Sequence, residues 1–155
     1  MNWDEWAFGL IGEIEKKSKD PSTKVGCLIT TKDHSFVSAG FNGFPRGVED
    51  NIQIVPQRYE RPEKYLWTEH AERNAIYGAE RSLRDCVVYV KWWPCADCAR
   101  GIIQSRISEV VLDGDSKEFN DTELNNRWKE QMDVSKVMLK EAGVNVRVFK
   151  RTKPE

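Results

Sequence analysis

Two short stretches, His70-Ala71-Glu72 and Pro94-Cys95-Ala96-Asp97-Cys98, determine what the fold of this chain must bring together. A catalytic zinc site typically uses three protein ligands and leaves a fourth position for water. Cys95 and Cys98 are three residues apart, so on a helix they share one face. The proline before them suits a first helical turn, and a helix N-terminus favours thiolate over thiol. The pattern therefore predicts a zinc site with His70, Cys95 and Cys98 as ligands.

The position of Glu72 restricts the local backbone. Residues i and i+2 of a regular helix point about 200° apart. We therefore expect His70 to lie at the very start of its helix, where the backbone can still turn, with Thr68 and Glu69 as capping residues. Glu72 cannot easily serve as a metal ligand and as a base at once, so we keep it outside the ligand set.

A structural zinc knuckle and a redox Cys-x-x-Cys are the alternatives for this pattern. Structural zinc sites usually close with four Cys or His ligands. The remaining candidates are Cys27, Cys86 and His34, and each lies in a different segment. The upstream His-x-Glu and the proline before Cys95 favour a catalytic site over both alternatives.

The two stretches match the zinc nucleobase deaminase signature H-x-E…P-C-x-x-C. The sequence resembles the cytidine and deoxycytidylate deaminase family, most of all its deoxycytidylate (dCMP) deaminases, to which the segments 18–26 and 40–47 are similar. The resemblance covers roughly Lys16–Leu112, and the C-terminal third fits only generically. It implies a three-layer α/β/α cytidine-deaminase-like fold with a mixed five-stranded sheet.

The resemblance also implies an activity, the zinc-dependent hydrolysis of dCMP to dUMP and ammonia with one Zn²⁺ per chain. Glu72 would be the proton shuttle. Four further positions would contact the substrate. Val25 would line the base pocket, Asn42 would bond the deoxyribose 3′-hydroxyl, the Ala71 N–H would hold the cytosine O2, and the Trp93 carbonyl would receive the departing amine. The paired Trp92-Trp93 departs from most relatives, so the pocket shape stays open.

Family resemblance further implies dCTP and dTTP effectors and a homo-oligomer, with a hexamer expected. Lys16, Gly43 and Arg46 are the predicted contacts for a phosphate or an allosteric nucleotide. A plain turn at Asn42-Gly43 is the alternative to a ligand loop there. The basic residues of the following segment either face a phosphate or form a solvated surface, and the sequence leaves both open. These residues are Arg46, Arg58, Arg61 and Lys64.

Length and composition limit the class of protein. A chain of 155 residues predicts one deaminase domain spanning 1–155. The 24 Lys and Arg against 25 Asp and Glu give a net charge of −1, which argues against bulk nucleic-acid binding. The cysteine usage fits a reducing compartment, and we expect a cytoplasmic protein. No apolar run approaches the roughly 20 residues of a membrane span.

Hydrophobic periodicity predicts alternating strands and helices, with a hairpin near the N-terminus and parallel strands later. A long loop is expected over 48–67, an edge strand at 144–148, and a charged, frayed tail over 150–155. The expected helices cover 2–18, 70–80, 95–106 and 121–142, and the other expected strands cover 24–30, 36–41, 85–91 and 109–112.

Other functions share parts of the pattern. A tRNA adenosine deaminase uses the same motif but usually needs a basic groove, which a net charge of −1 does not support. A riboflavin-pathway deaminase usually adjoins a reductase domain, and free-cytidine deaminases typically carry Cys in place of His70. A zinc-stabilised binding module without activity would have no use for Glu72.

Overall fold

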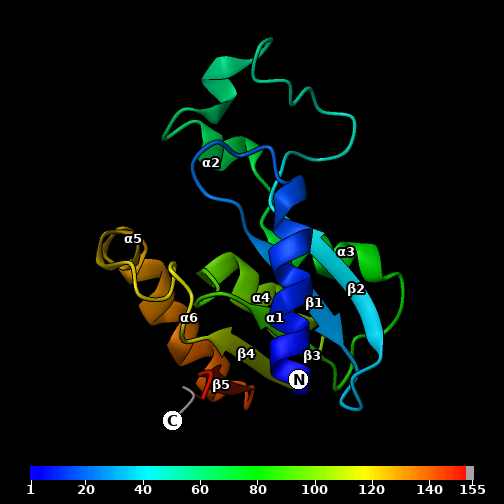
Figure 1. Ribbon diagram of the computed structural model, residues 1–155. Helices are drawn as coiled ribbons and strands as arrows, with labels where there is room; N and C mark the ends of the chain where they lie inside the picture. The colour runs from blue at the N-terminus through cyan, green and yellow to red at the C-terminus, as the bar shows by residue number, and fades with distance from the viewer. Residues whose placement is uncertain (153–155) are drawn as a thin grey trace.

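The computed structural model describes residues 1–152, and a mixed five-stranded sheet runs through its centre in the order β2-β1-β3-β4-β5 (Figure 1). β1 pairs antiparallel with both β2 and β3, whereas β3, β4 and β5 are parallel. A short turn joins β1 to β2, and helices make the crossovers that parallel strands require. The strands are β1 (Gly26–Thr30), β2 (Phe36–Phe41), β3 (Val87–Val90), β4 (Glu109–Asp113) and β5 (Asn145–Phe149).

Helices cover both faces of the sheet and confirm the expected three-layer arrangement. One cluster of buried side chains joins α1 to the sheet, and a second joins α3, α4 and α6 to the opposite face. The helical segments are α1 (Trp3–Ile14), η1 (Glu15–Lys17), η2 (Pro56–Tyr59), α2 (Lys64–Trp67), α3 (Ala71–Ala79), α4 (Ala96–Gln104), α5 (Thr122–Arg127) and α6 (Lys129–Glu141).

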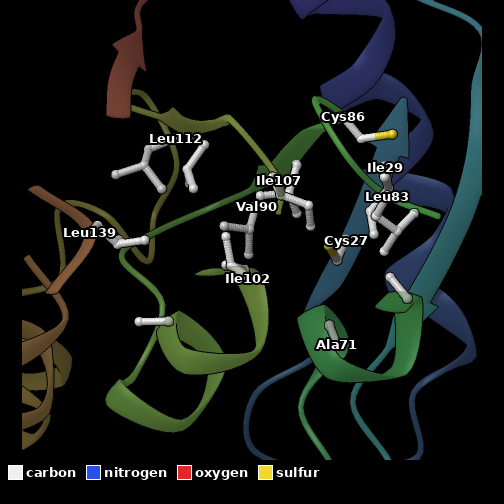
Figure 2. Close-up of a cluster of buried hydrophobic side chains, with 14 residues drawn as sticks. Cys27, Ile29, Ala71, Leu83, Cys86, Val90, Ile102, Ile107, Leu112 and Leu139 are labelled. Carbon is white, nitrogen blue, oxygen red and sulfur yellow. The ribbon is translucent and has the colours of Figure 1, made fainter. Parts of the chain in front are cut away.

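The strands divide their side chains between the two layers because successive residues of a strand point to opposite faces. In β1, Leu28 packs under α1, whereas Cys27 and Ile29 pack on the α3 side. All four residues of β3 are buried, as expected for a central strand covered on both faces. Figure 2 shows the larger cluster, in which Ala71 of α3 lies near Cys27 of β1.

A segment between β2 and α3 extends away from the sheet (Figure 1). A bridge between Gly43 and Glu69 closes its base, and we call residues 44–68 the projecting lobe. The predicted loop over 48–67 is wrong in part, because the lobe contains η2 and α2. The Phe44 and Tyr59 rings stack at 4.6 Å and give this short segment packing of its own.

Two predicted helices are shorter than the sequence pattern indicates. The helix expected over 2–18 ends at Ile14 and continues as the 3₁₀ turn η1. The helix expected over 121–142 is divided at Trp128, whose φ of −102° and ψ of 11° lie outside the α-helical region. This break directs the two halves, α5 and α6, differently.

The predicted frayed tail is wrong at Arg151. Its guanidinium lies 2.8 Å from the Asp113 carboxylate, and its backbone N–H bonds Asp115, so this part of the tail is anchored to the end of β4. Residues 153–155 lie outside the described residues. The edge position of β5 is confirmed. Across residues 1–152, no helix combines the length and apolar character that a bilayer crossing requires.

Candidate metal centre and active site

Both ligand-bearing helices begin at a predicted ligand. His70 is the N-cap of α3, with extended backbone (φ −79°, ψ 155°), and Cys95 is the N-cap of α4 (φ −69°, ψ 172°). This confirms that His70 lies at the very start of its helix. The expectation that Thr68 and Glu69 would cap the helix is wrong, because His70 takes that position. The Glu69 carboxylate instead accepts the His70 backbone N–H at 3.2 Å.

The three predicted ligand atoms converge. His70 Nδ1 lies 3.3 Å from Cys95 Sγ and 3.5 Å from Cys98 Sγ, and all three atoms lie within 4.8 Å of one another. A tetrahedral zinc ion would hold a ligating nitrogen and sulfur about 3.5 Å apart. The residues present therefore fit zinc. Within residues 1–152 the cluster offers three Cys or His ligands rather than the four of a closed structural site.

The pKa values of the Cys95 and Cys98 thiols are shifted in opposite directions. A hydrogen bond from Cys98, supported by the His70 imidazole, lowers the pKa of Cys95 to about 4. The same bond, together with burial, raises the pKa of Cys98. Burial acts to lower the pKa of His70, but the neighbouring Cys95 thiolate outweighs it and raises that pKa. The site thus favours thiolate, which is the form that binds a metal, at Cys95.

Glu72 lies in the first turn of α3, beside the ligand cluster and almost fully buried, at 5% exposure. Burial raises the pKa of its carboxyl, and the nearby His70 charge opposes that rise. A carboxyl with a raised pKa can both accept and return a proton near neutral pH. Glu72 also lines the cavity that opens beside the metal ligands.

This cavity has a volume of about 90 Å³, and it brings together every substrate-contact residue predicted from the resemblance. Asn42 is buried, and its amide braces the neighbouring loop by accepting the Val25 N–H at 2.8 Å and donating to the Thr23 carbonyl at 2.9 Å. The four predicted contacts that line the cavity are Val25, Asn42, Ala71 and Trp93.

The predicted effector contacts are dispersed. Gly43 lines a second cavity of about 280 Å³, which shares Asn42 with the first. Lys16 lies outside the lining of both cavities and bonds the exposed Glu13 at 2.8 Å. Arg46 is exposed in the projecting lobe and likewise contributes to neither lining. The roles of Lys16, Gly43 and Arg46 stay predictions.

Sequence reasoning missed the far wall of the active-site cavity. The Trp128 ring meets the His70 ring edge-to-face at 6.0 Å and the Tyr65 ring at 5.5 Å. The sequence indicated Trp128 only as part of an apolar helical stripe, and the helix break that turns it inward has no local signal. The missed residues of this wall are Tyr65, Leu124, Arg127, Trp128 and Met132, whereas Arg61 and Lys64, which also line it, belong to the basic set for which the sequence left a phosphate role open.

Comparison with known proteins places these features in a family. The model of the cytidine and deoxycytidylate deaminase zinc-binding region matches residues 1–113. An uncharacterized deaminase from the luxG 3′ region of Aliivibrio fischeri is 42% identical over 144 residues, which cover 93% of this chain and 91% of the relative. The deoxycytidylate deaminase of Mus musculus is 32% identical over 152 residues, which cover 96% of this chain and 80% of the relative.

A solved structure shows the same fold. The dCMP deaminase of cyanophage S-TIM5, crystallised with dCMP and dUMP, matches with a TM-score of 0.63 and 23% identity, covering 95% of this chain and 93% of that one. Together with the His70, Cys95 and Cys98 site, these matches show that the chain is a zinc-binding deaminase that belongs to the cytidine and deoxycytidylate deaminase family.

Proposed function

We propose that this enzyme converts dCMP and water to dUMP and ammonia. The observation that carries the proposal is a single cavity lined by two of the metal ligands, by Glu72 and by basic side chains that suit a 5′-phosphate. The deoxycytidylate deaminase of Mus musculus, a relative over nearly the whole chain, supports the same substrate.

His70, Cys95 and Cys98 would hold the zinc ion. When bound, zinc supplies Lewis-acid chemistry that makes water nucleophilic at neutral pH. Glu72 takes a proton from the attacking water as the C4–O bond forms and gives it to ring N3. It then takes the second proton, from the C4 hydroxyl, and gives it to the amine as the C4–N bond breaks. The nitrogen leaves as ammonia, so atoms and charge balance.

The base and the sugar are held by the inner wall of the cavity. The first backbone amides of a helix have no partner within the helix, so the Ala71 N–H at the start of α3 is free to bond the cytosine O2. Val25 would pack against the ring and Asn42 would reach the 3′-hydroxyl. The Trp93 carbonyl would receive the amine, beside a ring over which Lys136 already lies at 4.9 Å.

Arg61 and Arg127 are the side chains that we assign to the phosphate. Both line the cavity, and within residues 1–152 the salt bridge of Arg127 is a long contact of 3.5 Å with the exposed Glu123. Lys64 lines the cavity too, but it is bonded to Asp20. Arg58 lies over the Trp67 ring at 4.0 Å. Guanidinium groups suit this role because they bond phosphate through two parallel N–H donors.

One assay tests the assignment. The zinc-loaded enzyme is offered dCMP, cytidine, dCTP and a tRNA anticodon stem, and ammonia release is measured for each. We expect the highest kcat/KM for dCMP. Faster ammonia release from cytidine than from dCMP would contradict the proposed recognition of a 5′-phosphate. Ammonia release from the tRNA stem alone would contradict dCMP as the substrate and indicate an RNA-editing deaminase.

We also propose a cytoplasmic homo-oligomer, a hexamer, whose activity responds to dCTP and dTTP. The second cavity supports an effector site, because Lys17 and Lys19 line it together with Gly43. Sedimentation with and without dCTP tests the proposal. A monomer under both conditions would contradict it.

A further inference from the structure

Arg73 of α3 forms a bridge between two segments that carry metal ligands. Its Nε donates to the Glu69 carboxylate, and its Nη1 lies 3.4 Å from the Asp97 carboxylate. The Arg73 side chain is 18% exposed, whereas that of Asp97 is 54% exposed. The bridge therefore starts inside the protein and reaches α4 near the surface.

Both partners of Arg73 adjoin ligands in the chain. Glu69 precedes His70 and accepts its backbone N–H at 3.2 Å. Asp97 lies in the first turn of α4, between Cys95 and Cys98. A displacement of the Arg73 guanidinium would therefore shift the segment that carries His70 and the segment that carries Cys95 and Cys98.

The charges around Arg73 are mostly negative. Burial opposes its positive charge, but the cysteine pair, which carries a thiolate, and the Glu69 carboxylate outweigh burial and raise the pKa of Arg73. A guanidinium is suited to this position because its planar fork can bond two carboxylates at once, whereas a lysine ammonium is a point charge on a flexible stem.

We propose that Arg73 is a positioning residue of the metal centre. Its guanidinium fixes the spacing between His70 and the two cysteines before zinc binds, and its charge offsets the thiolates. Removing a group that holds metal ligands in place typically weakens metal affinity 10- to 100-fold. The inference rests on the zinc site and does not depend on dCMP being the substrate.

A purely structural role makes a different prediction. An ion pair that only joins α3 to α4 would stabilise the metal-free fold and leave zinc affinity unchanged. A positioning role changes zinc affinity and the ligand geometry even where the metal-free protein keeps its unfolding temperature. Metal affinity and ligand-field spectra therefore separate the two roles.

The experiment compares Arg73→Gln, Arg73→Lys and Arg100→Gln with the wild type. Arg100 is the matched control, because it bonds the same Asp97 from an exposed position. Zinc affinity is measured by competition with a chromophoric chelator, and Co²⁺ loading reports ligand geometry through its absorption bands. We expect Arg73→Gln to bind zinc about 10- to 100-fold more weakly, Arg73→Lys to be intermediate, and Arg100→Gln to match the wild type.

Unchanged zinc affinity and an unchanged Co²⁺ spectrum in Arg73→Gln would overturn the proposal. If that variant fails to fold, Asp97→Asn removes only the α4 end of the bridge, and Arg100→Gln corrects for the other partner of Asp97. Weaker zinc binding in Asp97→Asn supports the proposal, and equal binding overturns it. A wild-type protein that binds no zinc overturns the metal site itself, whereas zinc binding without dCMP turnover overturns only the proposed substrate.

Discussion

The ammonium group of Lys64 lies 3.1 Å from the carboxylate of Asp20, 44 residues earlier in the chain, and both side chains are buried. The Asp20 carboxylate also accepts hydrogen bonds from the backbone N–H groups of Ser22 and Thr23, so its charge has several hydrogen-bond partners. The pair joins the projecting lobe to the loop after η1, and both residues line the active-site cavity. Their contact fixes the lobe against the body at the substrate site.

Replacing one member of this pair should destabilise the protein strongly. Lys64→Met leaves a buried carboxylate without its partner, which typically costs about 3–5 kcal/mol. Urea unfolding followed by circular dichroism measures this change. Lys19→Met is the control, because Lys19 also bonds a lobe residue, Asp50, but from an exposed position, and such pairs contribute about 0–1 kcal/mol. Equal effects of the two substitutions would contradict the role of burial.

Glu72→Gln should remove activity while leaving the metal in place. The amide keeps the size of the carboxyl but cannot carry the proton, and the loss of a general acid–base group typically costs about 10²- to 10⁴-fold in rate. Turnover and zinc content are measured on the same sample. Glu80→Gln, at the exposed end of α3, serves as the control. Full turnover in Glu72→Gln would exclude it as the proton shuttle.

Arg127→Gln should impair dCMP turnover and spare cytidine turnover. Charge-assisted hydrogen bonds contribute about 1.5–3 kcal/mol, so we expect kcat/KM for dCMP to fall roughly tenfold or more. The control is Arg84→Gln, which removes an exposed charge outside the cavity lining. A parallel loss for both substrates would show that Arg127 shapes the cavity rather than binding a phosphate.

Several features of the fold and of the site could be predicted from the sequence alone. The spacing of His70, Glu72, Cys95 and Cys98 predicted the ligand cluster and the turn at the start of α3. Alternating and continuous apolar runs predicted all five strands and the edge position of β5. The strands and the turn depend on neighbours within a few residues, which periodicity and capping rules describe, whereas the convergence of His70 with two cysteines about 25 residues on was predicted from the match to the deaminase signature.

The features that the sequence did not predict depend on distant residues. η2 and α2 have four residues each, too short for a periodic pattern, and the stacked Phe44 and Tyr59 support the segment that contains them. Trp128 interrupts a sequence that reads as one continuous helix, and tertiary packing overrides that propensity. The Lys64 and Asp20 pair joins two segments that look like solvated loops. The cavity wall is built from these long-range contacts.

The pairing of Asp4 in α1 with Arg147 in β5 predicts how stability changes with pH. The two side chains form hydrogen bonds of 2.7 and 2.8 Å, and the bond from Arg147 lowers the pKa of Asp4 below 3.8. A depressed pKa means that the stabilisation is fully present above the unfolded pKa and is lost as pH falls through the folded pKa. Asp4→Asn should therefore cost about 1 kcal/mol at neutral pH, and the difference from the wild type should shrink toward zero under acid.

Urea unfolding of both proteins between pH 7 and pH 2 measures that difference. The control is Asp133→Asn, since Asp133 pairs with Lys129 on the exposed side of α6. Salt screens exposed charges far more than partly buried ones. The Asp133 effect should therefore vanish in high salt, whereas part of the Asp4 effect should persist, because the Asp4 side chain is 18% exposed and that of Arg147 is 41% exposed. A difference between wild type and Asp4→Asn that stays constant down to pH 2 would mean that the Asp4 charge does not hold α1 to β5.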